Sequence, residues 1–348
     1  MSTELLFIAG FLVFIGVMMA IDLGLFGKAS KPVSLKQAAI MSGVWVALAM
    51  GFYILIRYFG HLLHDVDSIA KLREINQKHF HQLAIDGNNL AASLQQYRKT
   101  LGLEFLTGYV VEYALSVDNI FVMVLIFTAF GVAPKNYHTV LLWGIIGAVL
   151  MRFLFIFLGA ALIDRFHWIL YVFGAFLVYT GITMFINRNK KEEIDPENHK
   201  VVKLAGRIFA VHPHFVSNKF FVEIEGKRMI TPLFLVLLII ETTDLIFAVD
   251  SIPAIFSVTK DPYIVFFSNI FAILGLRSMF FLLVNIIEKF HYLKVGLAAL
   301  LGFIGLKMLL SHYADMIGLT TFNSLIVILS ILTISIVASL LFPKRKVT

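Results

Sequence analysis

Nine long apolar runs constrain this sequence more than any other feature. They lie at about residues 4–26, 35–60, 104–130, 137–160, 167–187, 230–257, 262–287, 292–311 and 320–342. Each is close to the roughly 20 residues that a helix needs to cross a bilayer. Hydrophobic residues make up 59% of the chain and charged residues 15%, which is too apolar for a water-soluble fold. The pattern predicts an all-α polytopic membrane protein with about nine transmembrane helices, and it excludes a soluble enzyme.

The Lys and Arg residues predict which side of the membrane each loop faces. With the N-terminus outside, 18 of the 29 fall in cytoplasmic loops and eight fall outside, the asymmetry typical of membrane proteins. We therefore expect a protein of the cell inner membrane with its C-terminus in the cytoplasm. No soluble module carries a basic patch with interleaved aromatic residues, so we expect the lipid bilayer, and not nucleic acid, as a partner.

The chain also contains an internal repeat. Three charged landmarks recur in the same order: Asp118 with Asp250, Arg152 with Arg277, and Asp164 with Glu288. Each copy spans three helices, so the two copies enter the membrane from opposite sides. This inverted arrangement is typical of secondary transporters, whose sites lie near the midplane between the copies.

These patterns predict six segments. They are two N-terminal helices (1–60), a polar extracytoplasmic segment (61–103), the first three-helix repeat (104–187), a basic cytoplasmic loop (188–229), the second repeat (230–311), and the last helix with a basic tail (312–348).

Six carboxylates fall in the predicted membrane helices: Asp22, Glu112, Asp118, Glu241, Asp244 and Asp250. An ionised carboxylate at a helix centre costs about 2.5–3.5 kcal/mol. Arg152 and Arg277 can neutralise at most two of the six. Protons or bound cations must therefore balance the charge of the remaining carboxylates. The alternative is that acid–arginine pairs have only a structural role and hold the helices together.

The neighbouring residues favour a hard metal cation. Asn119, Ser251, Thr242 and Thr243 add neutral oxygen atoms, and the chain has no cysteine. Such an oxygen-rich set suits Mn²⁺, Ca²⁺ or Mg²⁺.

Spacing refines this interpretation. Glu241 and Asp244 are three residues apart and share a helix face, whereas six residues separate Asp244 from Asp250 and Glu112 from Asp118. Six residues turn a helix by about 600°, so the members of each of those pairs point in different directions. Pro253 is expected to kink or break its helix and free the carbonyl of Val249.

Three runs carry a family resemblance. The runs are Glu112-Tyr-Ala-Leu-Ser-Val-Asp-Asn-Ile-Phe, Glu241-Thr-Thr-Asp-Leu-Ile-Phe-Ala-Val-Asp-Ser-Ile-Pro and Asp22-Leu-Gly-Leu-Phe. They resemble the TerC family of integral membrane proteins, which is named for tellurium resistance and includes the Alx-type proteins. The resemblance covers about residues 4–342. It implies a LysE-like transporter fold, export of a divalent cation, chiefly manganese, and the six acids as metal-site residues.

Proton antiport is the expected energy source, because no nucleotide-binding motif is present. We expect no tightly bound cofactor and no enzymatic activity; the metal is cargo. An intramembrane aspartyl protease with Asp118 and Asp250 as its dyad leaves the other four acids unexplained. A membrane scaffold that assists secretion machinery, or the metalation or insertion of exported proteins, is the alternative function.

Weaker signals lie outside the membrane runs. His61, His64, Asp65 and Asp67, with His79 and His81 nearby, have the composition of a metal site, but a solvated helix end is expected. Two glycine pairs, Gly144 with Gly147 and Gly302 with Gly305, are expected to serve helix packing.

Overall fold

The computed structural model describes residues 3–22, 34–81, 83, 85–166, 168–188, 190, 194–196, 198–284, 290, 292–310 and 320–342. All nine predicted runs are helices within these ranges. They are α1 (Thr3–Asp22), α2 (Leu35–Phe59), α4 (Leu90–Ala129), α5 (Pro134–Arg165), α6 (Ile169–Asn187), α8 (Pro232–Phe256), α9 (Pro262–Leu283), α10 (Leu293–Leu309) and α12 (Thr321–Leu341). Eight of them are long and apolar enough to cross a membrane, and α10 has 17 residues. The chain is an all-α polytopic membrane protein, as predicted.

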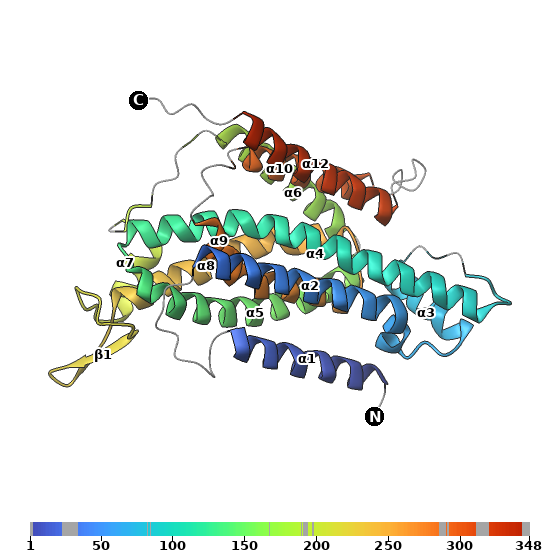
Figure 1. Cartoon of the computed structure of the whole chain (residues 1–348), viewed down its shortest axis with the longest axis horizontal. Coiled ribbons are helices and arrows are strands. Elements are labelled where there is room, and N and C mark those ends of the chain that lie inside the picture. Colours follow the sequence, from blue (N-terminus) through green and yellow to red (C-terminus); the bar gives the residue numbers. More distant parts are fainter. Residues whose placement is uncertain are drawn as a thin grey trace.

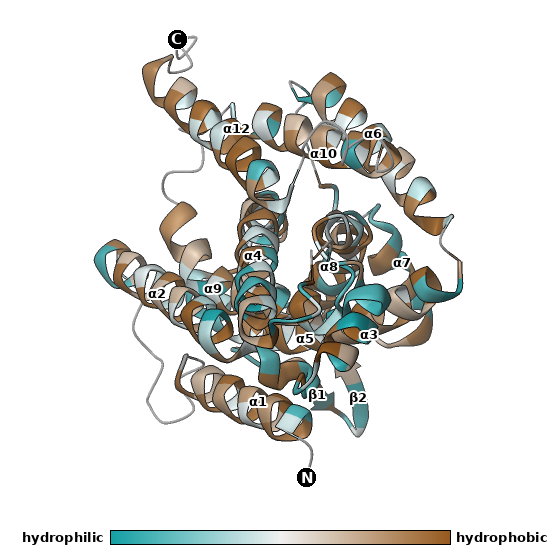
Figure 2. Cartoon of the chain, turned by 90° about the vertical axis from the view of Figure 1, so that its right-hand side faces the viewer, coloured by the Kyte–Doolittle hydropathy of each residue, from teal (hydrophilic) through white to brown (hydrophobic). Residues whose placement is uncertain are grey.

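The long helices run side by side along one axis (Figure 1). Viewed down that axis, α4, α5, α8 and α9 form the centre, and α1 and α12 lie on opposite outer sides (Figure 2). Helix α9 is buried along nearly its whole length, whereas α1, α6 and α12 expose many large apolar side chains. Because these outer faces cannot be hidden within the bundle, they contact the lipid bilayer.

The polar segment between α2 and α4 folds onto one end of the bundle. It contains a short 3₁₀ helix, η1 (Gly60–His64), and α3 (Ile69–His79). Asn89 caps α4 by accepting a hydrogen bond from the Ala92 amide, so this helix begins 14 residues before the predicted apolar run. Its 40 residues span about 60 Å, about twice the hydrocarbon thickness of a bilayer. The first part of α4 therefore extends beyond the membrane beside α3.

The basic segment between α6 and α8 lies at the opposite end (Figure 1). It forms a short helix, α7 (Lys200–Ile208), and a hairpin of β1 (Phe221–Ile224) and β2 (Lys227–Ile230). The hairpin was not predicted. Its two turn residues, Glu225 and Gly226, have φ values of 51° and 73°, which is the geometry of a type I′ turn.

The two predicted repeats correspond to α4–α5–α6 and α8–α9–α10. If a twofold axis relates the repeats, α4 corresponds to α8 and α5 corresponds to α9. The contact between α4 and α9 then has its equivalent in the contact between α8 and α5, and both contacts are present. Helices α6 and α10, which would be partners on the axis, pack closely along their length. These contacts fit the relation, but the repeat boundaries stay a prediction. The landmark Glu288 lies outside the described residues.

Glycines explain the close approach of α6 and α10. A methyl group on Gly305 would lie 2.7 Å from the carbonyl oxygen of Gly174, and one on Gly181 would lie 2.8 Å from that of Ala298. Backbone therefore contacts backbone at this seam, and the expected packing role of Gly305 is confirmed.

Candidate functional site

The Arg152 cluster lies at the centre of the bundle, on α4, α5, α8 and α9. Arg152 is fully buried, and its guanidinium donates hydrogen bonds to Glu112 Oε1, Asn269 Oδ1 (2.5 Å) and Asp244 Oδ1 (3.3 Å). The Asn269 side-chain amide also donates to Glu112 Oε2 at 3.5 Å. One cation therefore faces two carboxylates that occupy equivalent positions in the two predicted repeats.

The Arg152 cluster is not electrically balanced by its own members. Glu112 is fully buried and Asp244 is 6% exposed, so the two carboxylates carry one more charge than Arg152 if both are ionised. Asp244 Oδ2 is buried and has no hydrogen-bond partner among the described residues. A proton or a cation is the physical means of balancing such a site.

Glu241 lies next to this cluster. Its carboxylate occupies the space in which a Gly147 side chain would stand. The lack of a side chain at Gly147 therefore makes room for the Glu241 carboxylate, in addition to any role in helix packing. Asp244, one turn further along α8, also faces α5, through its bond to Arg152. The predicted shared face of Glu241 and Asp244 is confirmed.

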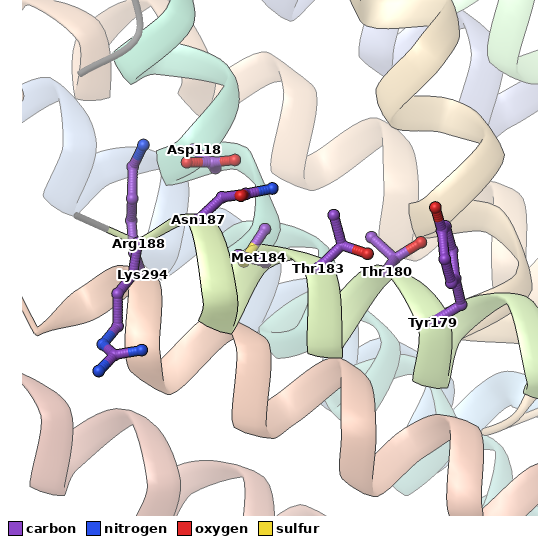
Figure 3. A pocket seen from close by; sticks show the side chains of 8 residues that line it. All are labelled: Asp118, Tyr179, Thr180, Thr183, Met184, Asn187, Arg188 and Lys294. Carbon is purple, nitrogen blue, oxygen red and sulfur yellow. The ribbon is translucent and has the colours of Figure 1, made fainter. Parts of the chain in front are cut away.

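Asp118 and Asp250 point elsewhere, toward α6. Asp118 lines a pocket of about 250 Å³ (Figure 3), together with Tyr179, Thr180, Thr183, Met184, Asn187, Arg188 and Lys294. Figure 3 shows that most of this lining comes from successive turns of α6. Asp250 accepts a hydrogen bond of 3.2 Å from Thr180 Oγ1. Thr180 is thus common to the pocket that contains Asp118 and to the contact made by Asp250.

The six-residue spacing accounts for this division. Glu112 and Asp244 bind Arg152, whereas Asp118 and Asp250, each six residues later, face α6. The predicted change of direction is confirmed in both copies. Glu112, Asp244 and the neighbouring Glu241 therefore lie at one place, and Asp118 and Asp250 lie at another. Both α4 and α8 contribute acids to each place.

Other predicted site residues have different surroundings. Asn119 is buried on α4. Arg277 forms a hydrogen bond of 3.0 Å with His138 Nε2, a partner that the sequence analysis did not foresee. Asp22 ends α1, and its side chain lies outside the described residues.

The hydroxyl groups that were predicted as neutral cation ligands differ in whether they already form hydrogen bonds. The hydroxyls of Thr242 and Thr243 donate to carbonyl oxygens of their own helix, while Ser251 Oγ is buried with no hydrogen-bond partner among the described residues.

The helix α8 runs through Pro253 and ends at Phe256. Of the two expected effects of this proline, a kink or a break, the break is therefore wrong. Pro253 still lacks the amide hydrogen that would bond to the Val249 carbonyl.

Several residues of the two places were missed from the sequence, among them Asn269, Thr180 and Lys294. Asn269 and Thr180 are uncharged and belong to no recognisable motif. Lys294 is charged, but its place near the start of α10 does not by itself distinguish it from other lysines at helix ends. Their roles depend on which helices are neighbours, and hydropathy does not contain that information.

Sequence comparison identifies the family. The family described as "Integral membrane protein TerC family" matches residues 97–347, which include every acid of both places and Arg152. The chain belongs to the TerC family. The resemblance of the runs at Glu112 and Glu241 to that family is thereby confirmed.

Relatives match over most of their length. An uncharacterised membrane protein of Myxococcus xanthus, STKORF319, is 43% identical over 98% of this chain and 93% of its own. A protein of Salmonella typhi, named as a proposed membrane-bound redox modulator, Alx, is 41% identical over 94% of this chain and 92% of its own. Its counterpart in Escherichia coli K12 is 40% identical over 87% and 85%. No solved structure matches this TerC family chain significantly.

Proposed function

We propose that this TerC family protein exports a divalent metal cation, most favourably Mn²⁺, across the inner membrane in exchange for protons. The observation that carries the proposal is the meeting of the two repeat-related aspartates at α6. Asp118 lines the pocket to which Thr180 belongs, and Asp250 accepts a hydrogen bond from the same threonine.

The donor chemistry of the α6 pocket supports a hard cation. The pocket is lined by the Asp118 carboxylate, threonine hydroxyls and the side-chain oxygen of Asn187, and the Asp250 carboxylate is bonded to Thr180 of the same lining. The sequence has no cysteine that could supply a thiolate. Carboxylate and neutral oxygen ligands suit Mn²⁺ and disfavour Cu⁺. The Lys294 ammonium at the same pocket supplies counter-charge when the cation is absent.

The Arg152 cluster supports coupling to protons. Glu112 and Asp244 share one arginine at the centre of four helices, and the carboxylate left over requires a positive partner. Carboxylates in a low-dielectric site hold either a metal or protons. Protons that compete with the metal for the oxygens of Asp118 and Asp250, together with a proton on the left-over carboxylate of the Arg152 cluster, couple release of the metal to uptake of protons.

Energetics make the coupling necessary. Each charge that moves against 100 mV costs about 2.3 kcal/mol, so a divalent cation leaving a negative interior faces about 4.6 kcal/mol. More than two protons must enter per metal ion if the exchange is to gain from the membrane potential.

The experiment is metal flux in proteoliposomes of the purified protein. An imposed pH gradient is expected to drive Mn²⁺ accumulation on the acidic side, with protons moving in the opposite direction. Asp118→Asn and Asp250→Asn should abolish this flux. Asp67→Asn is the matched control, because Asp67 is an exposed carboxylate near α3 and its loss should leave flux unchanged.

Two results would contradict the proposal. Mn²⁺ that follows only its own gradient, without proton movement, would indicate a channel or uniporter. No flux of any divalent cation by the wild-type protein would favour the scaffold alternative instead. This chain has no cysteine, so a redox role like the one in the names of its relatives could not use a thiol of this chain.

A further inference from the structure

A second group of ligating side chains lies at the end of the bundle that carries α3, far along α4 from the acids of the proposed transport route. His64 of η1, His79 of α3 and Asp261 before α9 each place one ligand atom within 4.8 Å of the others. All three are buried, with exposed fractions of 5%, 6% and 0%. The expectation of a solvated helix end is therefore wrong for both histidines.

Two atoms of this His64–His79–Asp261 triad lack hydrogen bonds. His64 Nε2 and Asp261 Oδ2 lie 3.5 Å apart, and neither has a hydrogen-bond partner among the described residues. Buried polar atoms without partners are uncommon in proteins and costly to maintain. Two such atoms that face each other beside a third ligand are the arrangement that a cation would satisfy.

The opposite atoms of the same side chains are held in place. His64 Nδ1 is 2.8 Å from the Tyr97 hydroxyl, and Asp261 Oδ1 accepts a hydrogen bond from the Tyr263 amide at 3.0 Å. In metal sites, ligating histidines and carboxylates are typically oriented by such outer hydrogen bonds. Here those bonds leave Nε2 and Oδ2 free to face the centre of the triad.

A third histidine stands beside the triad in the same manner. His81 Nδ1 lies 3.0 Å from Glu104 Oε1, while Glu104 Oε2 accepts a hydrogen bond from Thr259. His81 Nε2 is buried and has no hydrogen-bond partner among the described residues. The ring centres of His79 and His81 are 5.7 Å apart, so His81 lies directly beside the triad.

The backbone at Phe80 brings the two histidines inward together. Phe80 has a φ of 55°, a left-handed conformation that costs energy for a bulky residue. Its own side chain is 50% exposed and contacts the Lys260 ammonium, while the residues on both sides of it are buried. The strained residue therefore turns both imidazoles toward Asp261.

We propose that His64, His79 and Asp261, with His81 as the additional ligand, form a zinc-type metal site that ties the α3 segment to the start of α9. Imidazole nitrogens with a single carboxylate oxygen suit Zn²⁺ and similar transition metals. The carboxylate set of the proposed transport route suits a harder ion. This site does not depend on the proposed function, because it shares no residue with either acidic place.

The test is zinc binding by the full-length protein, purified in detergent with a tag that contains no histidine and stripped with a chelator. Zn²⁺ bound per chain is measured by mass spectrometry after desalting, and Co²⁺ is used as a spectroscopic substitute because its tetrahedral complexes absorb strongly in the visible range. Asp261→Asn is the most informative variant, since asparagine retains the oxygen that caps α9 and loses the anionic ligand. His79→Gln removes a second ligand, and His61→Gln on η1 is the matched control outside the triad.

We expect one Zn²⁺ per wild-type chain and a tetrahedral Co²⁺ spectrum. Affinity should fall at least about tenfold in Asp261→Asn and His79→Gln and stay unchanged in His61→Gln. Asp244→Asn in the Arg152 cluster should leave this zinc binding intact, which separates the site from the transport proposal. Absence of zinc from the wild-type protein, or equal affinity in all variants, would overturn the proposal.

Discussion

Removal of the buried guanidinium is the sharpest test of the Arg152 cluster. Arg152→Met keeps a long unbranched side chain but takes away hydrogen bonds to Glu112, Asn269 and Asp244. Two carboxylates that are almost completely buried then lose their cation. Breaking a buried ion pair by removing one partner typically costs 3–5 kcal/mol, so we expect a loss of about that size in the free energy of unfolding.

A compensating variant separates charge from packing. If Glu112→Leu and Asp244→Leu are added to Arg152→Met, no buried charge remains in the Arg152 cluster, and apolar replacement of buried ion pairs is often neutral or stabilising. We expect the triple variant to recover most of the lost stability while transport is abolished. A cavity effect alone would predict the reverse, because three substitutions disturb more packing than one.

The assay is reversible unfolding in mixed micelles, followed by tryptophan fluorescence, with and without Mn²⁺. Arg152→Met should lose more stability without the metal than with it, since a bound cation partly replaces the missing positive charge. This account of the cluster would be refuted if Arg152→Met were as stable as the wild-type protein. It would also be refuted if the variant lost equal stability with and without Mn²⁺.

Three further predictions follow from other contacts. Thr180→Val should lower Mn²⁺ flux without abolishing it, measured in proteoliposomes, because it removes the hydroxyl that donates to Asp250 but keeps both carboxylates; unchanged flux would argue against a role for the threonine. Gly305→Ala should destabilise the protein by about 1–3 kcal/mol in thermal unfolding, because the new methyl group meets the carbonyl of Gly174. Gly302→Ala has open space around the added carbon and should be nearly neutral; equal effects would contradict the tight seam. In intact cells an impermeant thiol reagent should label Asn88→Cys beside α4 and spare Asn218→Cys near the hairpin, and the reverse would overturn the predicted orientation.

Hydropathy predicted the membrane helices well because the bilayer imposes a length and a composition on each of them. It misplaced the start of α4 by 14 residues. Beyond the membrane, the helix from Leu90 to Leu103 is stabilised by the Asn89 cap and by packing against neighbouring elements, and neither effect makes a segment apolar. The hairpin at Glu225-Gly226 was missed for a different reason, because its turn uses two left-handed residues between strands of only four residues each.

The candidate site was predicted in part. Charge inside the membrane marked Glu112, Asp244 and Arg152, and helical spacing separated them correctly from Asp118 and Asp250. The lateral neighbours could not be predicted, because Asn269 and Thr180 are uncharged residues of helices whose pairing the sequence pattern leaves open. The same limit applies to His64 and Asp261, which are almost 200 residues apart in the sequence and adjacent in space.

The length of α4 has a consequence for how the protein can be observed. Glu104, Glu112 and Asp118 are carried by one uninterrupted helix, at axial separations of about 12 Å and 21 Å from the first. A helix shifts as a unit, so an axial displacement that opens the pocket beside Asp118 must also move Glu104 against His81 and Thr259. A fluorophore attached near the projecting end of α4 would then report the axial displacement of this helix during transport. It could be measured from the aqueous side, without a label in the membrane.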